Sequence, residues 1–144
     1  MPHYQRTFKY EVLSPHGPVD SAQAVSAVVP ARDGQVGVLA GRAPLAAVLG
    51  AGSLGFQRPD GSVREYFVSG GFAQVHDGTL TVLAEQCLPA AELDLQTAWD
   101  ELQRARAAVA KGAGRIARFD AELEAVRRKF NMVQRLVRRK GRTA

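Results

Sequence analysis

Residues 30–45 read PARDGQVGVLAGRAPL, a stretch that predicts two β-strands joined by a tight turn. Asp33-Gly34 is a strong hairpin dipeptide, because a two-residue type I′ turn needs positive φ at both central positions. Val36 and Val38 then supply apolar strand residues, and Pro44 ends the segment. The run lacks the Gly-Lys-Ser/Thr ending of a phosphate-binding loop. We therefore interpret it as a structural or partner-facing β-loop.

Short segments rich in β-branched and aromatic residues lie on both sides of this stretch, between residues 7 and 83. Turn signals separate them at intervals of about 8–12 residues, which is typical of an all-β sandwich or barrel. Two of these turns are expected at Ser69-Gly70-Gly71 and at His76-Asp77-Gly78. The other expected strands are residues 8–13, 24–29, 45–49, 53–57, 63–68, 72–75 and 79–84.

The composition changes at Pro89 to one that favours helices. Residues 90–110 are rich in Ala, Leu, Gln, Glu and Arg, with Asp94 as the expected N-cap. Gly112-Ala113-Gly114 ends this helix, and a second one follows. The predicted fold class is therefore α+β, with an all-β sandwich over residues 1–88 and an antiparallel two-helix hairpin over residues 89–144.

Apolar residues of the second helix recur at alternating spacings of three and four, which is the pattern of a coiled-coil seam. These residues are Ile116, Phe119, Leu123, Val126, Phe130, Val133 and Val137. In the hairpin we expect the seam to be formed by Leu102, Val109, Phe119, Leu123 and Val126. The helices have unequal lengths, roughly 24 Å and 37 Å at 1.5 Å per residue. The last two turns, with Val133 and Val137, therefore lack a partner on the first helix and are predicted to dock on the protein's own sandwich, on another subunit, or on both in alternation.

The net charge of +5 belongs to the C-terminal tail. Residues 125–144 contain eight basic side chains and no acidic one, which leaves eleven basic against fourteen acidic side chains in residues 1–124. No apolar run approaches the roughly 20 residues of a membrane span, and the N-terminus does not read as a signal peptide. The single cysteine, Cys87, is expected to be a small buried residue in a reducing compartment.

The sequence does not assemble a recognisable active site. Ser69 lacks the Gly-x-Ser-x-Gly context of a nucleophile elbow. His3, His16 and His76 lack neighbouring ligands at metal-binding spacing. Glu101, like the nearby Asp100, is expected to be a solvated helix charge. We therefore predict a non-enzymatic protein without a metal or cofactor.

Two motifs give the chain a family resemblance. Gly34-x-x-Gly37-Val38-Leu39-x-Gly41-x-Ala43-Pro44-Leu45 and Phe67-Val68-Ser69-Gly70-Gly71-Phe72 precede the helical hairpin. In this order they resemble the epsilon subunit of F-type ATP synthases over the whole chain. The resemblance implies a sandwich of about ten strands and a mobile two-helix C-terminus. It also implies a place in the central stalk, where the subunit joins gamma to the ring of membrane c subunits and rotates with them.

The resemblance also implies roles for individual positions. The turn that corresponds to the c-ring contact consists of Arg32, Asp33, Gly34, Gln35 and Val36, and the gamma-facing positions are Arg42, Ala43 and Pro44. Arg42 stands where the family usually has His. Some members bind ATP through Ile/Leu-Asp-x-x-Arg-Ala, and the corresponding positions here are Leu93, Asp94, Thr97 and Ala98. Because Thr97 replaces the arginine, we expect this site to be degenerate.

The function expected from these observations is that of a non-catalytic rotor subunit whose helices modulate ATP hydrolysis. Its partners would be gamma, the c ring and the alpha/beta catalytic head, at the cytoplasmic face of the bacterial inner membrane, with membrane contact only through the complex. An acidic loop on the beta subunit is the implied partner of Arg127, Arg128, Arg135, Arg138 and Arg139. One alternative is a small β-domain whose basic helix binds nucleic acid or an anionic membrane. An unrecognised enzyme is another, and a solvated helix face is a further explanation of the arginines.

Overall fold

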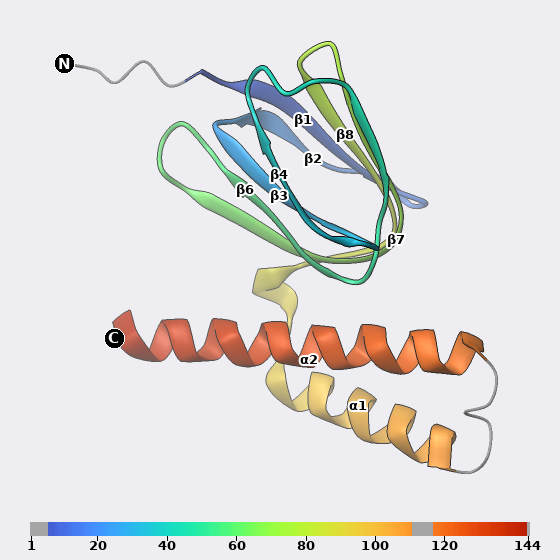
Figure 1. The fold of residues 1–144 in the computed structure, drawn as a ribbon. Coiled ribbons are helices and arrows are strands. Elements are labelled where there is room, and N and C mark those ends of the chain that lie inside the picture. Colours follow the sequence, from blue (N-terminus) through green and yellow to red (C-terminus); the bar gives the residue numbers. More distant parts are fainter. Residues whose placement is uncertain (1–5, 111–116, 144) are drawn as a thin grey trace. The chain divides into compact units, whose positions relative to one another are not determined.

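The computed structural model describes residues 6–110 and 117–143. The chain divides into two compact units between Leu88 and Pro89. The first unit is built from strands and the second from helices (Figure 1). The predicted α+β fold class, a β-sandwich followed by a two-helix hairpin, is confirmed.

The described residues of the first unit form one hydrogen-bonded path of strands, β2-β1-β8-β7-β6-β3-β4, and β5 pairs with β7. β1 runs parallel to β8, while β1–β2, β3–β4, β3–β6, β5–β7 and β6–β7 are antiparallel pairs. The strands are β1 (Phe8–Ser14), β2 (Gly17–Ala24), β3 (Ser26–Ala31), β4 (Gly34–Leu39), β5 (Leu45–Val48), β6 (Gly52–Gln57), β7 (Val63–His76) and β8 (Thr79–Pro89). Figure 1 shows this sheet folded over on itself.

The described strands number eight rather than about ten, and β7 explains much of the difference. The turn expected at Ser69-Gly70-Gly71 is instead a bend inside one strand of 14 residues. Gly70 and Gly71 have φ of +73° and +110°, and a Cβ on Gly71 would collide with the carbonyl oxygen of Leu83. The first half of β7 pairs with β6 and the second half with β5. Glycine therefore lets one strand serve both parts of the sandwich.

The type I′ turn predicted at Asp33-Gly34 is not formed. Ala31 pairs with Gly34, so the two turn residues are Arg32 and Asp33. The amide of Arg32 donates to the carbonyl of Val48 (2.9 Å), which directs it toward β5 rather than β4. Asp77 is the only described residue other than glycine with positive φ.

The hairpin turn expected at His76-Asp77-Gly78 is formed, and φ of +49° at Asp77 and +74° at Gly78 gives it type I′ character. It joins β7 to β8, so this prediction is confirmed. Residues 17–23 were left without a strand, but they form β2 together with Ala24 and pair with β1, so the strand expected over residues 24–29 begins only at Ser26.

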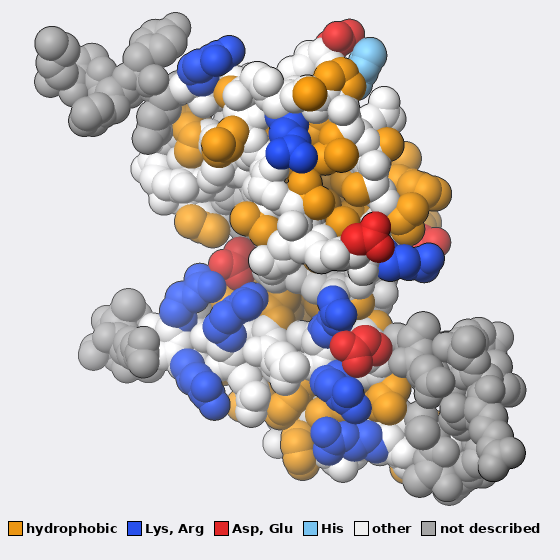
Figure 2. All heavy atoms as spheres, viewed as in Figure 1, with side chains coloured by type: hydrophobic (Ala, Val, Ile, Leu, Met, Phe, Trp, Pro, Cys, Tyr) orange, Lys and Arg blue, Asp and Glu red, His pale blue; other side chains and the backbone are white. Residues whose placement is uncertain are grey.

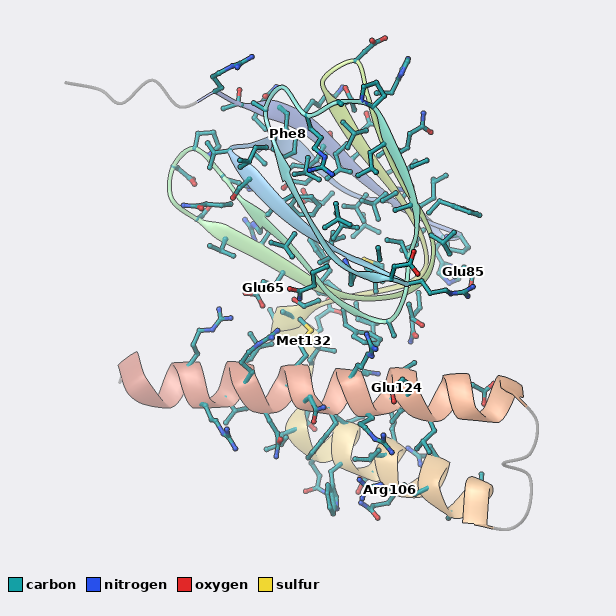
Figure 3. All side chains as sticks on the ribbon, in the orientation of Figure 1. Phe8, Glu65, Glu85, Arg106, Glu124 and Met132 are labelled. Atoms are coloured by element: carbon teal, nitrogen blue, oxygen red, sulfur yellow. The ribbon has the colours of Figure 1, made fainter. Side chains whose placement is uncertain are left out.

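The core of the sandwich is formed by aromatic and branched side chains that alternate along the strands. The rings of Tyr10 and Phe56 stack with centroids 3.8 Å apart, and Tyr66 meets Phe56 edge to face. Phe8 joins this core at the start of β1 (Figure 3). Cys87 packs partly buried against it, and burial raises the pKa of its thiol to about 11.

The second unit contains a short 3₁₀ turn, η1 (Ala90–Glu92), and the helices α1 (Leu95–Ala110) and α2 (Ala117–Thr143), which run antiparallel (Figure 1). The helices have 16 and 27 residues, about 24 Å and 40 Å. Asp94 is the N-cap of α1, as predicted, because its Oδ2 accepts the amide of Thr97 (3.0 Å). The glycine break at residues 112–114 lies outside the described residues.

The apolar seam joins the two helices over the part that the structure describes. Leu102 is buried and Leu123 and Val126 are half-buried, while the side chains of Val109 and Phe119 lie outside the described residues. Trp99 contacts Phe130, with ring centroids 5.4 Å apart. Toward the end of α2, Val133 is 2% exposed and Val137 is 48% exposed. Of these two residues, which were predicted to have no partner on the first helix, only Val137 is exposed, and the identity of their docking partner stays a prediction.

Candidate functional site

The turn between β3 and β4 presents an exposed tip on a braced backbone. Arg32, Asp33, Gly34 and Gln35 are exposed, and Val36 is half-buried. The end of β3 is fixed by the Arg32–Val48 backbone bond, by a bond from the Gly50 amide to the Pro30 carbonyl (2.9 Å) and by a bridge between Ala31 and Leu49. The structure thus brings the predicted c-ring residues together at one tip.

The loop between β4 and β5 carries the second predicted set. Arg42, Ala43 and Pro44 are all exposed. The loop turns tightly, because the Arg42 amide donates to the carbonyl of Leu39 (3.2 Å) and Gly41 has φ of +82°. This loop follows the end of β4, and the β3–β4 turn precedes its start. The two are therefore separated by the length of β4, about 17 Å. The two predicted contact regions therefore lie at opposite ends of one edge strand.

A groove of about 510 Å³ lies beside this loop. Its walls include Val28 of β3, Leu39 of β4, Gly41 and Arg42. Val28 is 42% exposed and Leu39 64% exposed. Sequence reasoning assigned no surface role to Val28, although the alternation of β3, with Ala27 and Val29 buried on either side, would have placed it outward.

Apolar side chains also form a row across the strands β5, β7, β8 and β1, exposed at Val48, Phe72 and Leu83 and half-buried at Leu13, which we call the apolar row. Val48 pairs with Phe72, and Leu83 pairs with Leu13. β7 and β8 are neighbours, and beside Phe72 the backbone of Gly71 lies close to the backbone of Leu83. Phe72 is 60% exposed, and Figure 2 shows hydrophobic side chains gathered on the visible face of the sandwich.

The sequence alone did not lead us to predict the apolar row. In β7, Ala73 and Val75 are buried, so the alternating pattern leaves the larger Phe72 on the outside. The available signal was this alternation alone, because the residue opposite Phe72 follows from the strand register, which the sequence does not give.

A polar cluster ties four parts of the sandwich together around Asp20. Its carboxylate accepts bonds from the hydroxyls of Tyr10 and Tyr66 (both 2.8 Å) and from Nη2 of Arg58 (3.2 Å). Burial opposes ionisation of Asp20, but the bonds from Tyr66 and Tyr10 outweigh it and lower its pKa. Burial and the bond to Asp20 raise the pKa of Tyr66. Every group of this cluster is engaged within the sandwich, so we interpret it as structural.

The residues of the degenerate ATP motif meet at the start of α1. Asp94 Oδ2 accepts both the amide (3.0 Å) and the hydroxyl (2.9 Å) of Thr97. The amide bond from Thr97, followed by its hydroxyl bond, lowers the pKa of Asp94. Leu93 is half-buried and Ala98 is buried. Thr97 thus completes the helix cap, and nucleotide binding here stays a prediction.

The predicted acidic-partner arginines lie along α2. All five are exposed: Arg127, Arg128, Arg135, Arg138 and Arg139. Arg127 and Arg128 both pair with Glu124 of the same helix, at 3.5 Å and 3.0 Å. Basic side chains cover much of the visible face of the helical unit (Figure 2).

The expectation that Glu101 is a solvated charge is wrong. Its Oε2 lies 2.9 Å from Nζ of Lys129, which is only 9% exposed. This ion pair joins α1 to α2. Sequence reasoning missed it because the two residues are 28 positions apart and their pairing depends on helix register.

No group of three or more potential metal ligands occurs among the described side chains. Neither described helix is long and apolar enough to cross a membrane.

The fold and these surfaces agree with comparisons to known proteins. A family model described as ATP synthase, Delta/Epsilon chain, beta-sandwich domain matches residues 7–90. The ATP synthase epsilon chain of Alkalilimnicola ehrlichii is 32% identical over 138 residues, which cover 94% of this chain and 99% of the relative. The chain belongs to the ATP synthase epsilon chain family. The epsilon chain of Nitrosococcus oceani is 31% identical over 94% of this chain and 98% of its own length.

Solved structures show the same fold. The Euglena gracilis mitochondrial ATP synthase, in a cryo-EM structure of OSCP, F1 and the c-ring, contains a chain that matches with a TM-score of 0.77 and 22% identity. The match covers 85% of this chain and 78% of that one. As an epsilon chain, the protein is a subunit of ATP synthase, and the comparisons do not support the alternative of a nucleic-acid-binding domain.

Proposed function

We propose that this epsilon chain is a non-catalytic central-stalk subunit that couples gamma to the c ring and modulates ATP hydrolysis through its helices. The single observation that supports this most strongly is the length of the family match, since 94% of this chain aligns with 99% of a named epsilon chain. The match spans the sandwich and the hairpin alike. A whole-chain match favours a shared role for both units, residues 1–88 as the attachment body and residues 89–144 as the regulatory arm.

The sandwich offers separate surfaces for two partners. We assign the turn of residues 32–36, which is exposed at residues 32–35, to the c ring, and the exposed loop of residues 42–44 to gamma. Because these lie at opposite ends of β4, both partners can bind at once. We also assign the apolar row to gamma, since β5 begins directly after this loop, and the row reaches the other end of β5, where the carbonyl of Val48 accepts the amide of Arg32. Exposed apolar residues that lie together are typical of a protein-protein interface.

Two exposed side chains of β7 allow a matched test of the gamma surface. Phe72 and Gln74 are both exposed and lie two residues apart on the outer face. Phe72→Ser removes a large apolar contact and is expected to reduce the amount of gamma retained on the immobilised chain, while Gln74→Ser leaves it unchanged. Equal retention by the two variants would remove the apolar row from the gamma surface.

The helical unit supplies the regulatory half of the proposal. α2 exceeds α1 by 11 residues, and this excess carries the exposed Val137 and several exposed arginines. An apolar residue among cations suits a partner with both apolar and acidic surface, which we assign to the alpha/beta head. The complex would place the protein at the cytoplasmic face of the bacterial inner membrane.

Removal of the arm tests the regulatory half. ATP hydrolysis is measured for the catalytic head reassembled with the complete chain or with a chain that lacks residues 113–144. We expect faster hydrolysis with the truncated chain, because a modulating arm limits the rate of the complete complex. Identical rates would refute regulation by the arm and leave the attachment role to be judged by gamma binding.

A further inference from the structure

We propose that the Glu101–Lys129 ion pair is a latch that holds α1 against α2 and sets how readily the two helices separate. Lys129 Nζ lies 2.9 Å from Oε2 and 3.3 Å from Oε1 of Glu101. The side chains are 11% and 30% exposed, respectively. A charge pair with this little exposure is screened by salt much less than one in open solvent.

The position of the pair follows from the seam. Glu101 immediately precedes Leu102 and Lys129 immediately precedes Phe130, and Leu102 and Phe130 both lie in the apolar seam. The two charged residues therefore occupy equivalent positions, each directly beside the apolar seam and on the same side of it. Because α1 and α2 run antiparallel (Figure 1), these two sides meet. Ion pairs at such flanking positions set the register and orientation of paired helices.

The Glu124–Arg128 pair shows why the Glu101–Lys129 pair can act as a latch. Glu124, labelled on α2 in Figure 3, and Arg128 lie on the same helix, are about half exposed and are 3.0 Å apart. Their attraction is the same whether the hairpin is closed or open. The Glu101–Lys129 attraction exists only while α1 and α2 are together, because parting the helices separates the two charges. Its contribution therefore favours the closed state alone.

The chain carries its own reporter of closure. Trp99 is the single tryptophan of the sequence, and its ring lies 5.4 Å from Phe130 of the other helix. Parting the helices removes this contact and uncovers the rest of the Trp99 side chain, which is 44% exposed in the closed hairpin. The wavelength of tryptophan emission and its quenching by iodide thus measure closure in the unmodified full-length chain.

Charge reversal and charge exchange test the latch. In Glu101→Lys the attraction becomes a like-charge repulsion, so we expect the ratio of closed to open hairpins to fall by roughly tenfold, with red-shifted emission and increased quenching. The double variant Glu101→Lys with Lys129→Glu restores an opposite-charge pair and is expected to return emission and quenching toward the wild type. Glu124→Lys is the matched control and should leave Trp99 unchanged.

Unchanged Trp99 signals in Glu101→Lys, or a response equal to that of Glu124→Lys, would overturn the latch. So would a double variant that keeps its helix content by circular dichroism yet does not recover. If Glu101→Lys loses its helices, the isosteric Glu101→Gln replaces it, with a smaller shift in the same direction expected and no shift contradicting the proposal.

The consequence of the latch for ATP hydrolysis rests on the proposed regulatory role of the arm, but closure itself does not. A Trp99 response without any change in hydrolysis by the assembled complex would therefore refute the regulatory role and leave the latch standing.

Discussion

Gly71→Ala is expected to destabilise the sandwich strongly, because Gly71 allows β7 to bend between its two partners. Its φ of +110° lies in a region that residues with a Cβ rarely adopt, and strain of this kind costs about 1–3 kcal/mol. The new Cβ would also collide with the carbonyl oxygen of Leu83. Relief requires β7 and β8 to move apart, which adds about 1–3 kcal/mol by analogy with overpacked cores.

The expected loss is therefore about 4 kcal/mol, from a total of about 5–15 kcal/mol for an ordinary domain. Urea unfolding of the full chain, followed by far-ultraviolet circular dichroism, measures it. With a slope of about 2 kcal/mol per molar urea, the midpoint of the sandwich transition should fall by about 2 M.

Gly37→Ala is the matched control. Gly37 lies on the edge strand β4, its φ is outside the left-handed region that favours glycine, and a Cβ there would meet no atom within 4 Å. Its midpoint should stay within about 0.5 M of the wild type. If the two variants unfold at the same urea concentration, the described bend in β7 is wrong.

Three further predictions concern Asp20, Cys87 and Asp94. The pKa of Asp20 is lowered in the fold, so its stabilising effect is present above the unfolded pKa of about 3.9 and is lost as pH falls through the folded value. The urea midpoints of Asp20→Asn and the wild type should therefore differ at pH 6 and converge at acidic pH, and a constant difference would contradict this. Because burial raises the pKa of Cys87 to about 11, iodoacetamide should alkylate it at pH 8 on the order of 100-fold more slowly than in the unfolded chain. Comparable alkylation rates in the folded and the unfolded chain would contradict the raised pKa of the Cys87 thiol. Asp94→Ala removes the cap of α1 and should lower the helical signal at 222 nm more than Asp100→Ala does, whereas equal signals would assign no role to the cap.

Patterns within a short stretch predicted the architecture well. The change of composition at Pro89 separated strands from helices, and the three-four spacing of residues such as Leu123 and Val126 predicted a seam. The cap at Asp94 and the turn at Asp77-Gly78 were also correct, because each depends on a few neighbouring residues.

Features that depend on distant backbone could not be predicted in this way. Gly70-Gly71 reads as a turn by itself, and only the neighbouring backbone of Leu83 makes it a bend within β7. The turn at residues 32–33 is placed by a bond to Val48, which the local sequence does not reveal.

The candidate surfaces that consist of one loop were predicted from the sequence. Those that depend on which residues lie opposite each other on paired strands or helices were missed. The exposed loop of residues 42–44 was found from its motif. The apolar row requires the register that sets Val48 opposite Phe72, and the latch requires the register that sets Glu101 opposite Lys129.

The measurement that tests the central claim most directly is the mass of the complex formed with gamma. The chain is expressed together with the gamma subunit of its own organism, purified through a tag on the chain, and measured by native mass spectrometry. The account predicts a species whose mass is that of one gamma subunit plus one 15.5 kDa chain. Recovery of the chain alone, with folded gamma present in the same extract, would contradict attachment to the central stalk.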